Sequence, residues 1–323
     1  MASPHRFGYL LVHFVEDPDG HGEQIYFSLS HGDDPLAWER LNAGRPVLGS
    51  HAGTTGVRDP HIIRAADGWF HIVATDLRVW RAEGQDWEEF RRHGSRSIVI
   101  WDSPDLVTWT GPRLVDVAPP SAGMAWAPET VLDPATGDYV LHFASALYAD
   151  DDPRHEGPAL AQLLTTRTRD FHSFTPAEPY LSLPGGVIDM TVAVDDDGRI
   201  HRFAKQDDEA PGSWQVFQQV GDRIDGDFRT LKTNLGQEFG PRVEGPLIFR
   251  ANDDERWYLW VDQYGRLPQG YHALTSPSLD GEWQPVPGFS LPAHTKHGAV
   301  LPLRDGEWER LRRRDADGGW PAP

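Results

Sequence analysis

Cysteine is absent from the 323 residues of this chain, which excludes disulfides, a thiolate nucleophile and cysteine metal sites. Apolar runs long enough to span a bilayer are also missing, so we expect no membrane partner. The N-terminus lacks the charged, apolar and cleavage regions of a signal peptide. Together these absences predict a cytoplasmic protein.

Basic residues are few, because 30 Lys and Arg stand against 49 Asp and Glu for a net charge of −19. Such a surface repels phosphate backbones, so nucleic acid is not an expected partner, whereas a neutral sugar is unaffected. The sequence also lacks a glycine-rich loop before a helix, paired histidines at zinc spacing and a Gly-x-Ser-x-Gly elbow. It therefore gives no indication of a nucleotide cradle, a zinc centre or a nucleophile elbow.

Long amphipathic helices are missing as well, and residues 81–94 predict only a turn or two of helix within a loop. Short runs of alternating, aromatic-rich β-formers follow Asp-Gly turns such as Asp67-Gly68 and Asp197-Gly198. This order is typical of antiparallel β-hairpins. The sequence therefore predicts an all-β chain.

Five short segments look alike, and each carries a polar residue that can do chemistry. Their sequences are VRDPHII, WAPETVL, VIDMTVA, EGPLIFR and KHGAVLP, and the polar residues are Asp59, Glu129, Asp189, Glu244 and His297. These residues recur about 50 to 70 positions apart, a period that suits one blade of a β-propeller.

The two ends of the chain complement one another. The run IYFSLSHGDDPLAW near the N-terminus resembles the outer strands of a blade but has no polar-headed strand before it. The segment KHGAVLP near the C-terminus has no outer strands after it. We therefore predict one domain over residues 1–323, a five-bladed β-propeller in which N- and C-terminal strands close one blade and no edge is left exposed.

The innermost strand of each blade lines the central channel, so the residues that open these strands converge at one mouth. Two carboxylates flanking a glycosidic bond are the usual means of glycoside hydrolysis, one as general acid and one as base or nucleophile. A third carboxylate nearby raises the pKa of the acid. The repeat thus predicts an acid/base site for sugars.

The order RDP, WAPE, VID, EGP and KHG resembles glycoside hydrolase family 43, five-bladed propellers that cleave arabinosides, xylosides and some galactosides with inversion. The resemblance covers residues 55–303 and the N-terminal closing blade. It implies that Asp59 is the general base, that Glu244 is the general acid, and that Asp189 orients the acid and adjusts its pKa. An inverting pair of this kind lies about 6.5–9.5 Å apart so that a water fits between base and sugar.

Other residues near these motifs are candidates for substrate contact, each with a structural alternative. Trp126 resembles the aromatic wall of the family's sugar pocket, or it packs in the core. Glu129 either touches a sugar hydroxyl or anchors a loop. Four further candidates, for contact with sugar hydroxyls or for structural ion pairs and loop contacts, are Arg58, Asp76, Arg78 and Gln263.

His297 matches a histidine that lies near the propeller axis in the family, beside a water-coordinated calcium or sodium ion. Hard cations prefer oxygen ligands, so an ion here would be held mostly by water and would be structural or electrostatic. The alternative is a histidine satisfied within the core. No cofactor is expected for the chemistry itself.

These features predict an inverting exo-glycosidase acting on oligosaccharides. The resemblance ranks terminal α-L-arabinofuranosyl units first, β-D-xylosides second and β-D-galactosides third. Exo action is suggested by the long loop 77–96, which can wall one side of the channel. The related fructan-cleaving propellers carry Asn-Asp-Pro-Asn-Gly and Glu-Cys motifs that this chain lacks, and a non-catalytic carbohydrate-binding propeller would be expected to have lost one of the three carboxylates.

Overall fold

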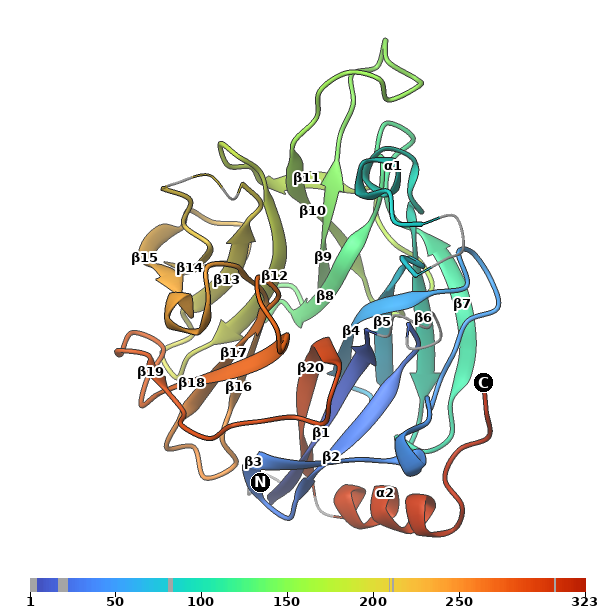
Figure 1. The fold of residues 1–323 in the computed structure, drawn as a ribbon, viewed down its shortest axis with the longest axis vertical. Coiled ribbons are helices and arrows are strands. Elements are labelled where there is room, and N and C mark those ends of the chain that lie inside the picture. The colour runs from blue at the N-terminus through green and yellow to red at the C-terminus, as the bar shows by residue number, and fades with distance from the viewer. Residues whose placement is uncertain (1–4, 17–22, 81–83, 209, 211, 305) are drawn as a thin grey trace.

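Five four-stranded antiparallel sheets surround a common axis in the computed structural model of the chain (Figure 1). The structure describes residues 5–16, 23–80, 84–208, 210, 212–304 and 306–323. The all-β, five-bladed propeller predicted from the repeat is confirmed. None of the helices in these ranges is long and apolar enough to cross a bilayer.

The blades are numbered I to V, and the strands of each blade are given from the innermost outward. Blade I consists of β20 (Thr295–Arg304), β1 (Arg6–Val15), β2 (Tyr26–His31) and β3 (Asp34–Arg40). Blade II consists of β4 (Val57–Arg64), β5 (Phe70–Asp76), β6 (Ser97–Ser103) and β7 (Thr110–Asp116). Blade III consists of β8 (Trp126–Leu132), β9 (Tyr139–Ala146), β10 (Ala161–Thr168) and β11 (Glu178–Leu181).

The last two blades follow the same order. Blade IV consists of β12 (Val187–Val194), β13 (Ile200–Gln206), β14 (Val216–Gly221) and β15 (Arg229–Leu235). Blade V consists of β16 (Val243–Arg250), β17 (Trp257–Gln263), β18 (Gly270–Ser276) and β19 (Gln284–Pro285). Helical segments of the described chain are α1 (Trp87–His93), α2 (Glu307–Ala316) and the 3₁₀ turns η1 (Asn42–Gly44) and η2 (Gln237–Phe239).

The ring closes in blade I, where C-terminal β20 pairs antiparallel with N-terminal β1. This is the closure that the complementary chain ends predicted. Helix α1 lies inside the loop that was expected to hold a turn or two of helix, although residues 81–83 of that loop fall outside the described ranges. Helix α2 was not predicted, and it packs below blade I against β1 and β20 (Figure 1).

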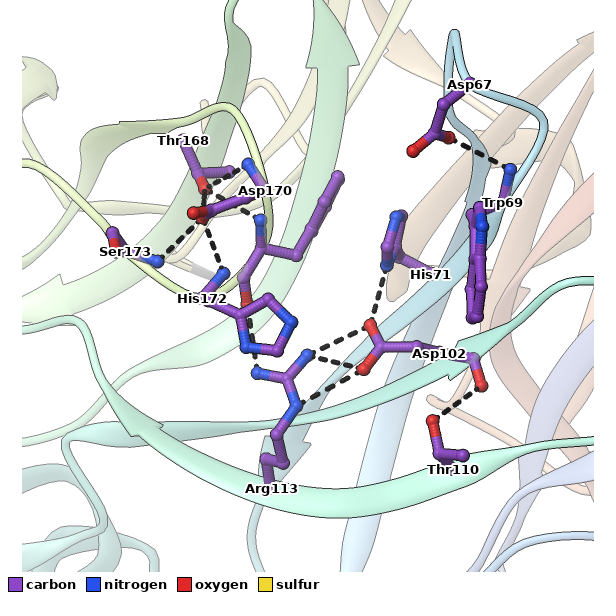
Figure 2. A network of polar contacts seen from close by, with 11 residues as sticks. Asp67, Trp69, His71, Asp102, Thr110, Arg113, Thr168, Asp170, His172 and Ser173 are labelled. Carbon is purple, nitrogen blue, oxygen red and sulfur yellow. Dashed lines mark hydrogen bonds and ion pairs between the residues drawn. The ribbon is translucent and has the colours of Figure 1, made fainter.

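Neighbouring blades are joined by polar contacts as well as by the apolar core (Figure 2). His71 of β5 contacts the Asp102 carboxylate at 2.7 Å, and Arg113 of β7 donates two hydrogen bonds to the same carboxylate through one nitrogen. Arg113 also donates to the Phe171 carbonyl in the corner that follows β10. There the Thr168 hydroxyl accepts from the Phe171 backbone at 2.9 Å, so this corner of blade III is fixed against blade II.

The inner strands share a β-bulge near their starts. The pairing register shifts between Arg58 and His61, Trp126 and Glu129, Ile188 and Met190, and Glu244 and Leu247. A residue with positive φ lies at each of these bulges, namely Asp59 (50°), Ala127 (46°), Asp189 (48°) and Gly245 (53°). Bulges re-aim side chains and recur beside active sites. In this propeller they occur where the candidate residues were expected.

Candidate active site

The bulges bring residues from four blades together around the axis. His297 of β20 lies at the corresponding register shift of blade I, and its Nδ1 is 3.5 Å from an Asp59 carboxylate oxygen. Asp189 accepts a hydrogen bond from the backbone N–H of Gly245 at 3.1 Å. The three carboxylates predicted for catalysis therefore belong to one buried cluster, in which Asp189 interacts electrostatically with both Asp59 and Glu244.

Asp59 is held as a carboxylate. Its burial works to raise its pKa, but the neighbouring His297, the Arg58 charge and the Thr75 hydroxyl outweigh burial, and the pKa lies below its ordinary value. The Thr75 hydroxyl donates to Asp59 at 2.9 Å and itself accepts from the Ala127 backbone at 2.7 Å. One threonine thus links the bulges of blades II and III and fixes the Asp59 carboxylate.

Glu244 is in the opposite state. Burial and the neighbouring Asp189 raise its pKa to about 8, against the attraction of Lys296. Its side chain is less deeply buried than that of Asp189 and makes no hydrogen bond or ion pair with another described residue. At neutral pH the Glu244 carboxyl group is therefore protonated, and no neighbouring side chain in the described ranges accepts a hydrogen bond from it.

Asp189 interacts electrostatically with both of these carboxyl groups. Burial raises its pKa, and the Asp59 charge adds to the effect, while His297 and the Gly245 N–H act in the opposite direction with a smaller result. The Gly245 N–H is available because Gly245 adopts a φ of 53° directly after Glu244. One backbone turn thus places the proton-bearing Glu244 beside Asp189.

Glu129 belongs to a deeper layer of the channel. It lies two residues beyond the bulge at Ala127, the position that His61 and Thr191 occupy in blades II and IV. Its carboxylate is 3.9 Å from His61 Nε2, and burial raises its pKa to about 8 despite the His297 charge and a hydrogen bond from Thr191. Glu129 thus contacts residues of the channel, and its contact with a sugar hydroxyl stays a prediction.

His297 holds a proton of its own. Burial opposes protonation, but its contact with Asp59 and the charges of Asp189, Asp59 and Glu129 raise its pKa to about 9. A protonated imidazole does not ligate a cation, and no three His, Asp or Glu side chains of the described ranges form a metal-binding group. The sequence led us to expect an ion held mostly through water, and such an ion beside His297 stays a prediction.

Four of the residues expected near the substrate make structural contacts, and their contact with a sugar stays a prediction. Arg58 pairs with Glu23 at 2.8 Å, and the Asp76 carboxylate accepts from the Thr54 backbone and hydroxyl at 2.8 Å each. Arg78 donates to the Trp80 carbonyl and to the Thr55 hydroxyl, which holds the loop beside β5. Gln263 bonds the Arg266 backbone in both directions and so shapes the turn after β17.

Trp126 lies at the mouth, where it opens β8 and is half-buried. Its ring meets the Trp87 ring edge-on at 6.1 Å, and the Arg91 guanidinium lies 5.7 Å from its centroid. It also packs against apolar side chains of blades III and IV. Trp126 thus has the place expected of a wall residue and also contributes to the core.

Sequence inspection missed Lys296, one residue before His297. Its ammonium group lies 2.9 Å from Asp262 and 3.5 Å from Glu16, and it is within electrostatic range of Glu244. Glu16 also approaches Arg58 at 3.7 Å. A lysine beside a motif histidine was the available signal, but its partners come from β17 and from the end of β1.

Comparison with known proteins bears on this cluster. A family described as "Probable glycosyl hydrolase domain", related to glycoside hydrolase family 43, matches residues 5–309. The chain belongs to this family. The expected glycoside hydrolase family and the five-bladed propeller are thereby confirmed, since both the match and the blade architecture extend over nearly the whole chain.

Individual known proteins are similar to this chain in sequence or in fold. An α-L-arabinofuranosidase of Bifidobacterium longum subsp. longum is 30% identical over 213 residues, which are 62% of this chain and 20% of that protein. The chain therefore spans about one fifth of the relative's length. A thermostable family-43 glycoside hydrolase shares the fold with a TM-score of 0.54 at 15% identity, over 77% of this chain and 80% of the other. The catalytic domain of a Coprinopsis cinerea family-62 α-L-arabinofuranosidase gives 0.51 at 14% identity, over 77% and 74%.

Proposed function

We propose that this glycosidase hydrolyses terminal sugars from oligosaccharides with inversion, and that α-L-arabinofuranosyl units are its preferred glycone. One observation carries the proposal: Asp59 and Glu244 belong to one buried cluster but are held in opposite protonation states. Acid and base roles are assigned by such a split of pKa values. An ionised base and a protonated acid at neutral pH are what single-displacement hydrolysis requires.

In the proposed reaction Asp59 accepts a proton from a water molecule as the water oxygen bonds to the anomeric carbon. The bond from that carbon to the leaving oxygen breaks on the other face, and Glu244 transfers its proton to this oxygen. Asp59 then releases its proton to solvent and Glu244 regains one. Asp189 stays unreacted, and its role is to keep the pKa of Glu244 high.

The glycone preference is supported by the name of the B. longum relative and by the motif resemblance. Exo action is supported by α1, because Arg91 of α1 pairs with Asp207 of blade IV at 2.5 Å and so spans the loops above blade III. A wall on one side of the mouth favours chain ends over mid-chain segments. β-D-Xylosides and β-D-galactosides are the alternative substrates, and the cytoplasmic location and single-domain organisation stay predictions from the sequence.

The test is hydrolysis of 4-nitrophenyl α-L-arabinofuranoside, β-D-xyloside and β-D-galactoside by wild type and by Asp59→Ala. We expect turnover of the arabinofuranoside that is lost in the variant. Proton NMR of the first-formed sugar should show the β-anomer, as inversion requires. First-formed α-anomer would contradict inversion, and no turnover of any substrate by wild type would favour a binding propeller.

A resident metal ion is not part of this proposal. The positive charge beside Asp59 and Asp189 is supplied by protonated His297, so prolonged dialysis against EDTA is expected to leave kcat/KM within about twofold of its starting value. A loss of activity that calcium restores would show that a water-coordinated ion is needed.

A further inference from the structure

Trp87, the first residue of α1, is an exposed tryptophan beside the channel mouth. Its relative exposure is 46%, although its edge packs against Phe90 at 5.8 Å and against Trp126 at 6.1 Å. Trp69 is exposed to a similar extent, 42%, but it lies at the turn between β4 and β5. Because β4 starts at the mouth, that turn is at the opposite end of the blade.

The surroundings of Trp87 connect it to the proposed active site. The Arg58 guanidinium lies 5.8 Å from its ring centroid, and Arg58 directly precedes Asp59. Trp126, its other neighbour, opens the inner strand that carries Glu129. Trp87 therefore lies above the starts of two adjacent inner strands, on the side where substrate enters.

The ring is held in place by contacts of its own helix. The Asp86 carboxylate caps α1 by accepting from the Glu89 backbone at 3.1 Å. Arg92 donates to the carbonyls of His155 and Gly157 in the loop after β9. Together with the Arg91–Asp207 pair, these contacts fix α1 to blades III and IV, so a ligand on Trp87 would lose little free energy in ordering the platform.

We propose that Trp87 is the stacking platform for the leaving-group sugar, which is the sugar unit that remains with the oligosaccharide after cleavage. The C–H groups on one face of a pyranose ring suit the electron-rich face of an indole. A single indole offers about 150–250 Å² of contact, far below the roughly 800 Å² per partner of a stable protein interface. This inference rests on the proposed function and adds the part of the substrate that the catalytic cluster does not touch.

The test compares two substrates with the same glycone. One is an arabinose-containing oligosaccharide, and the other is the corresponding glycosyl fluoride, whose leaving group is a single atom. We expect Trp87→Ala to lower kcat/KM for the oligosaccharide about tenfold, mainly through KM, because the contact is made equally in ground and transition states. The loss on the fluoride should be far smaller, and Trp87→Phe should recover most of the oligosaccharide activity.

Trp69→Ala is the matched control, since it removes an equally exposed indole from the other end of the propeller. It should leave both substrates at the wild-type rate. Equal losses on oligosaccharide and fluoride in Trp87→Ala, or identical behaviour of the two alanine variants, would overturn the platform.

Calorimetric binding of the same oligosaccharide separates this inference from the proposed function. If wild type cleaves nothing but Trp87→Ala weakens binding about tenfold relative to Trp69→Ala, the platform stands and the hydrolytic role is wrong. If the two variants bind alike, the platform is wrong whatever the activity.

Discussion

Single side chains decide the chemistry of this cluster, because Asp59 and Glu244 are both half-buried and differ in their partners. Asp59 has a hydroxyl donor and a protonated His297 beside it. Glu244 has the negatively charged Asp189 and Asp262 as well as Lys296 within electrostatic range. Burial alone would neutralise both groups, so the donors to Asp59 create the difference.

The first residue-scale prediction separates the two roles by leaving group. Glu244→Ala should lower kcat at least about a hundredfold on oligosaccharides, the range of general acid catalysis, and much less on 4-nitrophenyl glycosides, which need little protonation. Asp59→Ala should be severe on both, since water activation is lost in either case. Rates of both variants on both substrates give the answer, and equal mild losses would contradict the roles.

The second residue-scale prediction concerns the alkaline limb of kcat/KM, which we expect near pH 8 from the pKa of Glu244. Lys296 lowers that pKa and Asp262 raises it. Lys296→Met should therefore move the limb to higher pH, and Asp262→Asn should move it to lower pH. If both variants lose stability and neither limb moves, Lys296 and Asp262 serve only the fold.

The residues that sequence inspection placed correctly are those whose position depends on their own strand. Asp59, Asp189 and Glu244 open inner strands, so the repeat alone brings them to the axis. Arg58 and Gln263 could not be judged in this way, because their partners are Glu23 and the turn at Arg266, which no repeat specifies. Side-chain pairing between loops requires the folded chain.

At the scale of elements, the bulges explain why the five segments are similar but not equivalent. Asp59 and Asp189 lie on the bulge, Glu244 lies one residue before it, and Glu129 lies two residues beyond the bulge residue of its strand. A pattern of polar residues at a common period cannot resolve such offsets. A left-handed aspartate costs about 1–2 kcal/mol, and this strain re-aims the carboxylate towards the axis.

Helix α2 and the tail after it show a second limit of the sequence pattern. Glu307 and Glu309 in the first turn and Arg313 and Arg314 in the last are helix signals, but Leu311 is the only buried apolar residue of the helix. With so narrow an apolar stripe, periodicity gives little indication of a helix.

The tail that follows α2 joins blades I and II. Trp320 is 4% exposed, donates to the Val107 carbonyl at 2.9 Å and packs edge-on against Phe27. We expect Trp320→Ala to lower the free energy of unfolding by about 3–5 kcal/mol, the usual result for a buried tryptophan. Trp320→Phe should cost less, since it keeps most of the packing. Urea unfolding midpoints measure both, and an alanine effect as small as that of Trp69→Ala would show that the tail does not join the blades.

At the scale of the whole molecule, closure of the propeller ring brings titratable groups of several blades into one channel. Three of these groups stay protonated at higher pH than they would in the unfolded chain. Glu129 and Glu244 keep their protons to about pH 8, against an ordinary value of 4.5, and His297 keeps its proton to about pH 9, against 6.5. Below about pH 6.5 the buried His13, His61 and His142 offset this excess, because burial lowers their pKa values to about 3 and only the unfolded chain protonates them. Above pH 7 the folded chain therefore binds more protons than the unfolded chain. The free energy of unfolding must then fall as pH rises.

This linkage predicts that the protein is more stable at pH 7 than at pH 9, a trend that paired surface carboxylates would not give. Asp59 does not offset the trend, because its lowered pKa acts only in acid. Melting temperatures should decline from pH 7 to pH 8 and again to pH 9. Glu129→Gln, which keeps the neutral shape of the protonated acid, should flatten the decline between pH 7 and 8 by removing one titrating group. Unchanged slopes in this variant, or a maximum at alkaline pH, would mean that Glu129 is ionised in the folded channel.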